Sequence, residues 1–226
     1  MENKANHLEY ALIDSWDWQT RVLHWINALL VLTLALLALS AEGMEALGID
    51  KSARKSVKEI HAYLGYIFVF TLGMRILWGF IGNKYARWSD IIPYKKEQWQ
   101  GIWSNMRFYL SGFKEKPPVA IGHNPMASLL YVPLFLVLIS EAISGILLAG
   151  LEFDLLPASA MVGGLGAGIK ETLEDFAEEM HEFGFLFIIF FICLHLGGLI
   201  LHEIVEKAGL FSSMIHWKKY FPKEKI

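Results

Sequence analysis

Charge and cysteine are both scarce in this sequence. Only 19% of the 226 residues are charged, against about 25% in soluble globular domains, which excludes an ordinary soluble domain. There is one cysteine, Cys193, and no Cys-x-x-Cys-His motif, so thioether attachment of a cofactor of the usual kind is excluded. Apolar residues make up 54% of the chain instead, and they gather in four blocks that are almost free of charge. Such blocks predict membrane spans.

The four blocks predict four transmembrane helices. They cover about residues 22–41, 60–82, 126–151 and 181–202. At about 1.5 Å per residue, each is long enough to cross a hydrocarbon core of about 30 Å. The first block is longer than the roughly 7 to 15 apolar residues of a signal peptide, which favours a retained span. We therefore expect an all-α membrane protein, a four-helix bundle that forms a single domain over residues 1–226.

The distribution of lysine and arginine predicts the orientation. With the N-terminus in the cytoplasm, the cytoplasmic segments hold 14 of the 20 Lys and Arg residues, and the outer loops hold five. The positive-inside rule therefore places both termini, including a C-terminal tail at 203–226, in the cytoplasm.

Two connecting segments show amphipathic helical patterns. The first predicts a helix at about 96–111 that lies on the cytoplasmic membrane surface, with an apolar face formed by Trp99, Ile102, Trp103, Met106 and Leu110. The second predicts a short periplasmic helix that leads into the fourth span. One of its faces is acidic and is either a solvated surface or a docking patch for a basic partner: Glu171, Glu174, Asp175, Glu178 and Glu179.

Four of the eight histidines lie inside or at the ends of the spans, where ionisable side chains are costly and usually functional. His181 and His195 are 14 residues apart, close to four helical turns, so they share a face and are separated by about 21 Å along it. His24 lies at the cytoplasmic end of the first span, and His61 lies at the outer end of the second. His61 and His181 therefore share the outer level, and His24 and His195 share the inner level.

Two histidine pairs at two depths predict two haems, each with one axial imidazole on either side of the iron. Without the thioether motif these are haem b, held by ligation and packing. Zinc would require three or four ligands at one depth, where this sequence offers two. Gly65, one turn from His61, and Gly184, three residues after His181, would let a flat macrocycle approach the backbone. For each histidine alone, a hydrogen-bonded structural role is the alternative. No catalytic residue is predicted.

Three further polar residues have open roles. Arg75 is 14 residues from His61 and is predicted at the inner level, as a partner of a propionate of the inner haem, part of a quinone pocket, or a side chain that reaches to the interface. His202 could replace His195 as a ligand, although its depth matches His24 less well. Glu141 lies in the middle of the third span, where it could transfer protons or form a hydrogen bond inside the bundle.

Several motifs resemble the bacterial cytochrome b561 and nickel–iron hydrogenase b-type cytochrome family. They are residues 21–25 (RVLHW), 60–65 (IHAYLG), 75–87 (RILWGFIGNKYAR) and 122–125 (GHNP), with His181 and His195. The resemblance covers nearly the whole chain and assigns the haem ligands to His24, His61, His181 and His195. It implies a di-haem protein of the bacterial inner membrane. Glu141 departs from the neutral residue expected at its position.

The resemblance also implies the function. We expect electron transfer between the membrane quinone pool and a periplasmic partner, either a c-type cytochrome or a hydrogenase. The first alternative is an enzyme that oxidises superoxide and reduces quinone without a partner, and the second is a transporter or structural bundle without a cofactor. Contacts with membrane lipid are expected and contacts with nucleic acid are not; the oligomeric state is left open.

Overall fold

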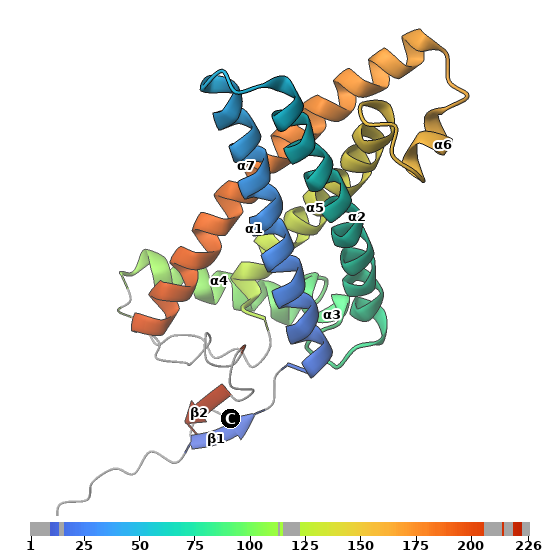
Figure 1. Ribbon diagram of the computed structural model, residues 1–226. Coiled ribbons are helices and arrows are strands. Elements are labelled where there is room, and N and C mark those ends of the chain that lie inside the picture. Colours follow the sequence, from blue (N-terminus) through green and yellow to red (C-terminus); the bar gives the residue numbers. More distant parts are fainter. Residues whose placement is uncertain are drawn as a thin grey trace, which may run out of the picture. The chain divides into compact units, whose positions relative to one another are not determined.

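The computed structural model describes residues 10–13, 16–112, 114, 123–205, 214 and 219–222. Its elements, in chain order, are β1 (Tyr10–Ile13), α1 (Trp18–Ala46), α2 (Lys51–Ile81), α3 (Trp88–Ile91), α4 (Lys96–Leu110), α5 (Pro125–Leu151), α6 (Ala158–Val162), α7 (Ala167–Val205) and β2 (Lys219–Pro222) (Figure 1). Among the described residues, four helices are long and apolar enough to cross a membrane: α1, α2, α5 and α7. The predicted set of four membrane-spanning helices is therefore confirmed.

The spanning helices extend beyond the apolar blocks, and α7 does so most. It has 39 residues, which corresponds to a length of about 58 Å, nearly twice the thickness of a hydrocarbon core. The predicted acidic helix and the fourth span are thus one continuous helix rather than two elements. The sequence explains this continuity, because no proline or glycine occurs between Gly168 and Gly184 to interrupt the helix.

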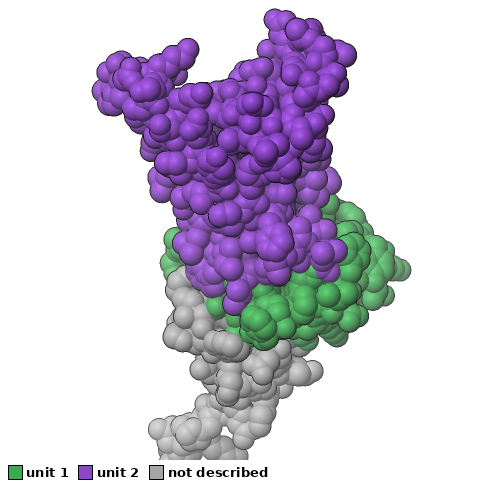
Figure 2. Space-filling model, turned by 45° about the vertical axis from the view of Figure 1, so that its right-hand side comes forward, with its two compact units in different colours: residues 1–21, 78–132, 192–226 green, residues 22–77, 133–191 purple. Residues whose placement is uncertain are grey.

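Contacts divide the chain into two compact units (Figure 2). Unit 1 comprises residues 1–21, 78–132 and 192–226, and unit 2 comprises residues 22–77 and 133–191. Unit 2 holds most of α1, α2 and α5, all of α6, and the first part of α7. A single domain over the whole chain stays a prediction.

The two short strands of unit 1 form a small antiparallel sheet. Tyr10 of β1 lies opposite Pro222 of β2, and Ile13 lies opposite Lys219. Neither strand is predicted by the sequence pattern. Because β1 precedes the first span and β2 follows the fourth, the pairing requires that both strands lie on the same side of the membrane. That this side is the cytoplasm stays a prediction.

Asp17 connects the start of α1 to the end of α2 within unit 1. Its carboxylate accepts hydrogen bonds from the backbone N–H of Thr20 at 2.8 Å, from the indole N–H of Trp78 at 3.1 Å and from the backbone N–H of Asn83 at 3.1 Å. The bond from Thr20 caps the first turn of α1. Burial acts to raise the pKa of Asp17, but the hydrogen bonds from these three residues outweigh it and hold that pKa below its usual value.

The helix α4 has two apolar faces rather than the single face predicted. Ile102 and Phe108 are buried together with Asn105, whereas Trp99 and Trp103 are exposed. Ile102 therefore packs into the core of unit 1 instead of joining the outer stripe. Exposed tryptophans are typical of a helix that lies on a membrane surface. The location of α4 on the cytoplasmic membrane surface stays a prediction.

His123, Asn124 and Pro125 position the start of α5. Asn124 caps α5 through its side-chain oxygen, and its amide group donates a hydrogen bond to Asn105 Oδ1 at 3.2 Å. His123 Nδ1 lies 2.8 Å from a carboxylate oxygen of Asp90. Pro125 is the first residue of the helix, where its missing N–H leaves no hydrogen bond unmade. These three residues therefore connect α3, α4 and α5 in this chain.

Candidate functional site

Unit 2 contains a cavity of about 1150 Å³ lined by residues of α1, α2, α5 and α7. Pockets for small ligands occupy about 300–1,000 Å³, so this cavity has room for a large cofactor. Apolar side chains from all four helices form much of its wall, including Leu34, Phe68, Ile146 and Phe185. His61 and His181 both belong to the lining.

His61 of α2 and His181 of α7 lie close together in this cavity. The centres of their rings are 6.0 Å apart, and the ring planes are inclined by 75°. A metal ion bound by one imidazole nitrogen on each side, with bonds of about 2 Å, would place the ring centres about 6 Å apart. The spacing of the two histidines therefore fits one metal centre between them.

Both rings are held at Nδ1 by neighbouring groups. The Nδ1 of His61 lies 3.1 Å from the backbone carbonyl oxygen of Leu34. The Nδ1 of His181 lies 3.0 Å from Ser144 Oγ and 3.3 Å from a carboxylate oxygen of Glu141. A partner at Nδ1 fixes the orientation and tautomer of an imidazole and leaves Nε2 for a metal. A hydrogen bond at the ring nitrogen that does not bind the metal accompanies most metal-binding histidines.

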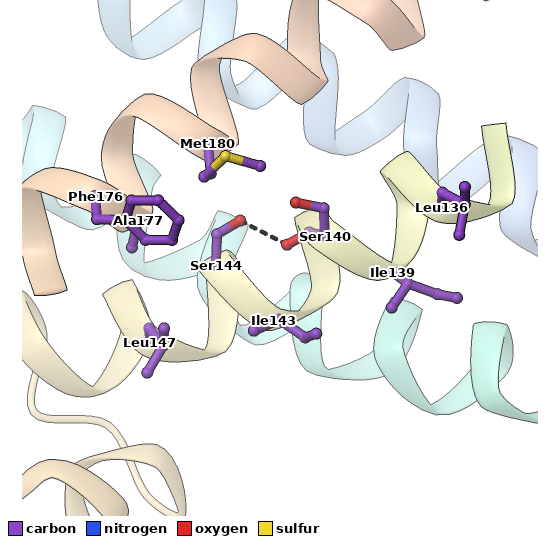
Figure 3. A pocket seen from close by; sticks show the side chains of 9 residues that line it. All are labelled: Leu136, Ile139, Ser140, Ile143, Ser144, Leu147, Phe176, Ala177 and Met180. Atoms are coloured by element: carbon purple, nitrogen blue, oxygen red, sulfur yellow. Dashed lines mark hydrogen bonds between the residues drawn. The ribbon is translucent and has the colours of Figure 1, made fainter. Parts of the chain in front are cut away.

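The hydrogen bonds of Ser144 indicate which group donates the proton in its bond with His181. The Ser144 hydroxyl donates to the carbonyl oxygen of Ser140 at 2.9 Å (Figure 3). Its oxygen therefore accepts the proton of His181 Nδ1. Ser144 also lines a smaller groove of about 300 Å³ between α5 and α7, where Phe176 and Met180 lie on the α7 side (Figure 3).

Three glycines adjoin the two histidines or their partners. A Cβ on Gly65 would meet nothing within 4 Å, and Gly65 lines the cavity, so open space lies beside it. A Cβ on Gly145 would lie 3.3 Å from the ring of His181. Gly184 does not make room for a macrocycle as predicted, because a Cβ there would overlap the carboxylate of Glu141. Gly184 makes room for Glu141 instead.

One end of the cavity, formed by the end of α1 and the start of α2, is lined by charged side chains. Arg54 pairs with Glu45 at 2.8 Å, and Lys58 pairs with Glu152 at 3.1 Å. The other charged lining residues outside the middle of the spans are Glu42, Lys51, Lys55, Glu178 and Glu182. The cavity is therefore apolar in part and carries charges of both signs at one end.

The residues predicted for the inner level do not join this site. His24 is half-buried in unit 2, where its ring packs edge-on against that of the following tryptophan. His195 is half-buried in unit 1. The guanidinium of Arg75 lies 5.6 Å from the ring centre of Phe135. The roles of these three residues at an inner haem stay predictions, and the side chain of His202 lies outside the described residues.

The site fits haem b better than a bare metal ion. Within the described part of the chain, no group of three or more His, Cys, Asp or Glu side chains could hold a metal ion. A haem iron needs only one axial imidazole on each side, which His61 and His181 can supply. The apolar wall and the open space beside Gly65 suit a macrocycle. The second carboxylate oxygen of Glu141 is buried and has no hydrogen-bond partner among the described residues.

Comparison with known proteins identifies the family. The family model for prokaryotic cytochrome b561 matches residues 15–217. The probable Ni/Fe-hydrogenase B-type cytochrome subunit of Azotobacter vinelandii is 26% identical over 210 residues, which cover 88% of this chain and 85% of that protein. The corresponding protein of Rhodobacter capsulatus is 25% identical over 223 residues, which cover 93% and 82%.

A shorter and stronger match is the probable Ni/Fe-hydrogenase 1 B-type cytochrome subunit of Escherichia coli (strain K12). It is 39% identical over 90 residues, which cover 39% of this chain and only 38% of that protein. No solved structure matches. The match of the family model to most of the sequence shows that the chain belongs to the prokaryotic cytochrome b561 family, multi-pass membrane proteins that bind haem b and transfer electrons.

Proposed function

We propose that this chain transfers electrons across the membrane, between a quinone and a periplasmic redox partner, with the help of two haem b groups. His61 and His181 are the ligands of the outer haem iron, and His24 and His195 are the ligands of the inner one. The observation that carries the proposal is the 6.0 Å spacing of the His61 and His181 rings inside a cavity of about 1150 Å³.

When bound, haem b supplies reversible one-electron redox chemistry at its iron. The chain supplies binding, orientation and exclusion of water. His61 and His181 would hold the iron through Nε2, while the carbonyl of Leu34 and the hydroxyl of Ser144 hold their rings in place. Apolar side chains of the cavity keep water away from the iron. At the inner level, Arg75 would be the cation that holds a propionate.

A hydrogenase is the periplasmic partner that we favour. The named relatives are hydrogenase cytochrome subunits by their printed names. A c-type cytochrome is the second candidate. Either partner requires a docking surface outside the membrane, and the exposed acidic side chains of α7, including Glu171, Asp175 and Glu179, offer one to a basic partner.

The haem content of the purified protein tests the proposal most directly. A reduced-minus-oxidised spectrum and a pyridine haemochrome assay are expected to give two haem b per chain. One haem or none per chain, in protein that is otherwise folded by circular dichroism, would contradict the two-haem arrangement.

Single histidine substitutions test the pairing. His61→Ala and His181→Ala are each expected to remove the outer haem, and His24→Ala and His195→Ala the inner one. The two haems can be distinguished by their midpoint potentials. The matched control is His7→Ala, outside the spans, which is expected to leave both haems bound. Loss of the same haem from His24→Ala and His61→Ala would refute the assignment by depth.

Hydrogen-dependent reduction tests the partner. Membranes that contain a hydrogenase and this chain are expected to reduce haem b under hydrogen gas. Membranes that lack this chain are expected to pass no electrons from the hydrogenase to quinone. Equal quinone reduction with and without the chain would remove the hydrogenase as its partner.

A further inference from the structure

Glu141 is the one acidic side chain in the apolar part of α5. Only 10% of its side chain is exposed. One of its carboxylate oxygens lies 3.3 Å from His181 Nδ1, and the other is buried with no hydrogen-bond partner among the residues that the structure describes. A buried carboxylate is costly unless a positive centre lies nearby, and in membrane spans such groups are usually functional.

The Glu141 carboxylate occupies space that a side chain at Gly184 would fill. Gly184 of α7 faces it, and a Cβ on that residue would lie 2.8 Å from Glu141 Cδ and 3.1 Å from Cγ. Gly184 is three residues after His181, so it lies close to one turn further along the same helix. A glutamate on α5 and a glycine on α7 are therefore matched to each other at the level of the proposed outer ligand.

The two proposed outer ligands have unlike surroundings. His61 Nδ1 contacts a neutral backbone carbonyl oxygen, that of Leu34. His181 Nδ1 contacts the Ser144 hydroxyl and the Glu141 carboxylate. The acceptor of the His181 Nδ1 proton is Ser144 Oγ, and an acceptor there raises the basicity of an imidazole ligand. A negative charge beside the ligand also favours the oxidised iron, which carries one more positive charge than the reduced iron.

We infer that Glu141 is a positioning residue that orients His181 together with Ser144 and lowers the midpoint potential of the outer haem. This inference rests on the proposed binding of haem between His61 and His181. A lower potential of the outer haem favours the transfer of an electron from the outer haem to the inner one. Glu141 thereby contributes to the driving force of that step.

The test is a potentiometric titration of the purified holoprotein at one pH, followed by optical spectroscopy. Glu141→Gln keeps the volume of the side chain and an acceptor oxygen but removes the charge. It is expected to raise the ferrous-to-ferric ratio of the outer haem about tenfold or more at a fixed potential, which corresponds to an upward shift of about 59 mV or more for one electron. The haem that shifts must be the one that His61→Ala removes.

Two further variants serve as controls. Glu141→Asp retains the charge and is expected to keep the potential nearer to that of the unmodified protein than Glu141→Gln does. Ser140→Ala removes a hydroxyl next to Glu141, in a residue whose backbone carbonyl rather than its side chain contacts Ser144, and is expected to leave both potentials unchanged.

The outcomes separate this inference from the function on which it rests. Two bound haems with unchanged potentials in Glu141→Gln would overturn the inference and leave the proposed function standing. If His61→Ala still binds two haems, the proposed function fails and the inference fails with it. If the Glu141→Gln protein does not retain the outer haem, the titration is repeated with the Gly184→Ala variant. The added alanine methyl group displaces the Glu141 carboxylate from His181. An upward shift in Gly184→Ala supports the inference, and an unchanged potential overturns it.

Discussion

Asp17→Ala is expected to destabilise the protein, because the Asp17 carboxylate connects the start of α1 to the end of α2. The change removes the cap of α1, at a cost of about 1 kcal/mol. It also leaves the indole N–H of Trp78 and the backbone N–H of Asn83 without their acceptor, and each unpaired donor costs about 1 kcal/mol at a partly exposed site. The free energy of unfolding should therefore fall by about 3 kcal/mol.

The assay is unfolding of the purified protein in detergent, monitored by circular dichroism at several pH values. The lowered pKa of Asp17 means that its charge stabilises the folded state above about pH 4, and that this contribution is lost as the pH falls through the folded-state pKa. The difference between the unmodified protein and Asp17→Ala should accordingly shrink in acid. Asp17→Asn, which keeps one acceptor oxygen, should lose less than Asp17→Ala. A difference below about 0.5 kcal/mol at pH 7, within the range of ordinary surface substitutions, would refute the role given to this carboxylate.

Three further predictions address packing and reactivity. Gly150→Val should lower the free energy of unfolding by about 1–3 kcal/mol, because a Cβ there would lie 2.7 Å from the backbone of Ala158; Gly164→Val, in open space, is the control, and equal losses would contradict this packing. Thr71→Val should cost about 1 kcal/mol, because it removes the hydrogen bond that Thr71 donates to Asn27 at 3.0 Å; an unchanged unfolding curve would show that this bond contributes nothing. Stopped-flow mixing of the purified protein with superoxide should give no fast haem reduction; a fast reaction would instead favour the superoxide:quinone oxidoreductase.

The spans and the spacing of the outer histidines follow from properties that a sequence expresses directly. Apolar blocks of about 20 residues are set by the thickness of the bilayer. Equal depth of His61 and His181 follows from the positions of these residues within their spans, since successive spans run in opposite directions. The 6.0 Å between their rings is consistent with that expectation. The ligand roles of His24 and His195, and of Arg75 and Gly65, remain predictions.

The contacts around the ligands could not be read from the sequence. Which residue holds His181 depends on the rotation of α5 about its axis, and hydropathy does not fix that rotation in a helix that is apolar all round. Ser144 and Gly184 therefore gave no signal of their partners, although an acid at Glu141 in mid-span was itself a signal. The sequence does not indicate the inner face of α4 for a related reason. Asn105 interrupts the apolar pattern, although it is buried and accepts a hydrogen bond from Asn124.

The pairing of β1 with β2 has a consequence for the order of assembly. The sheet joins Tyr10 to Pro222, so its hydrogen bonds cannot form until the last span has been synthesised and inserted. Contacts between such distant parts of a chain form slowly, and until then β1 exposes an unpaired strand edge. A nascent chain arrested before residue 219 would keep this edge open to pairing with other chains, even with all four spans already in the membrane.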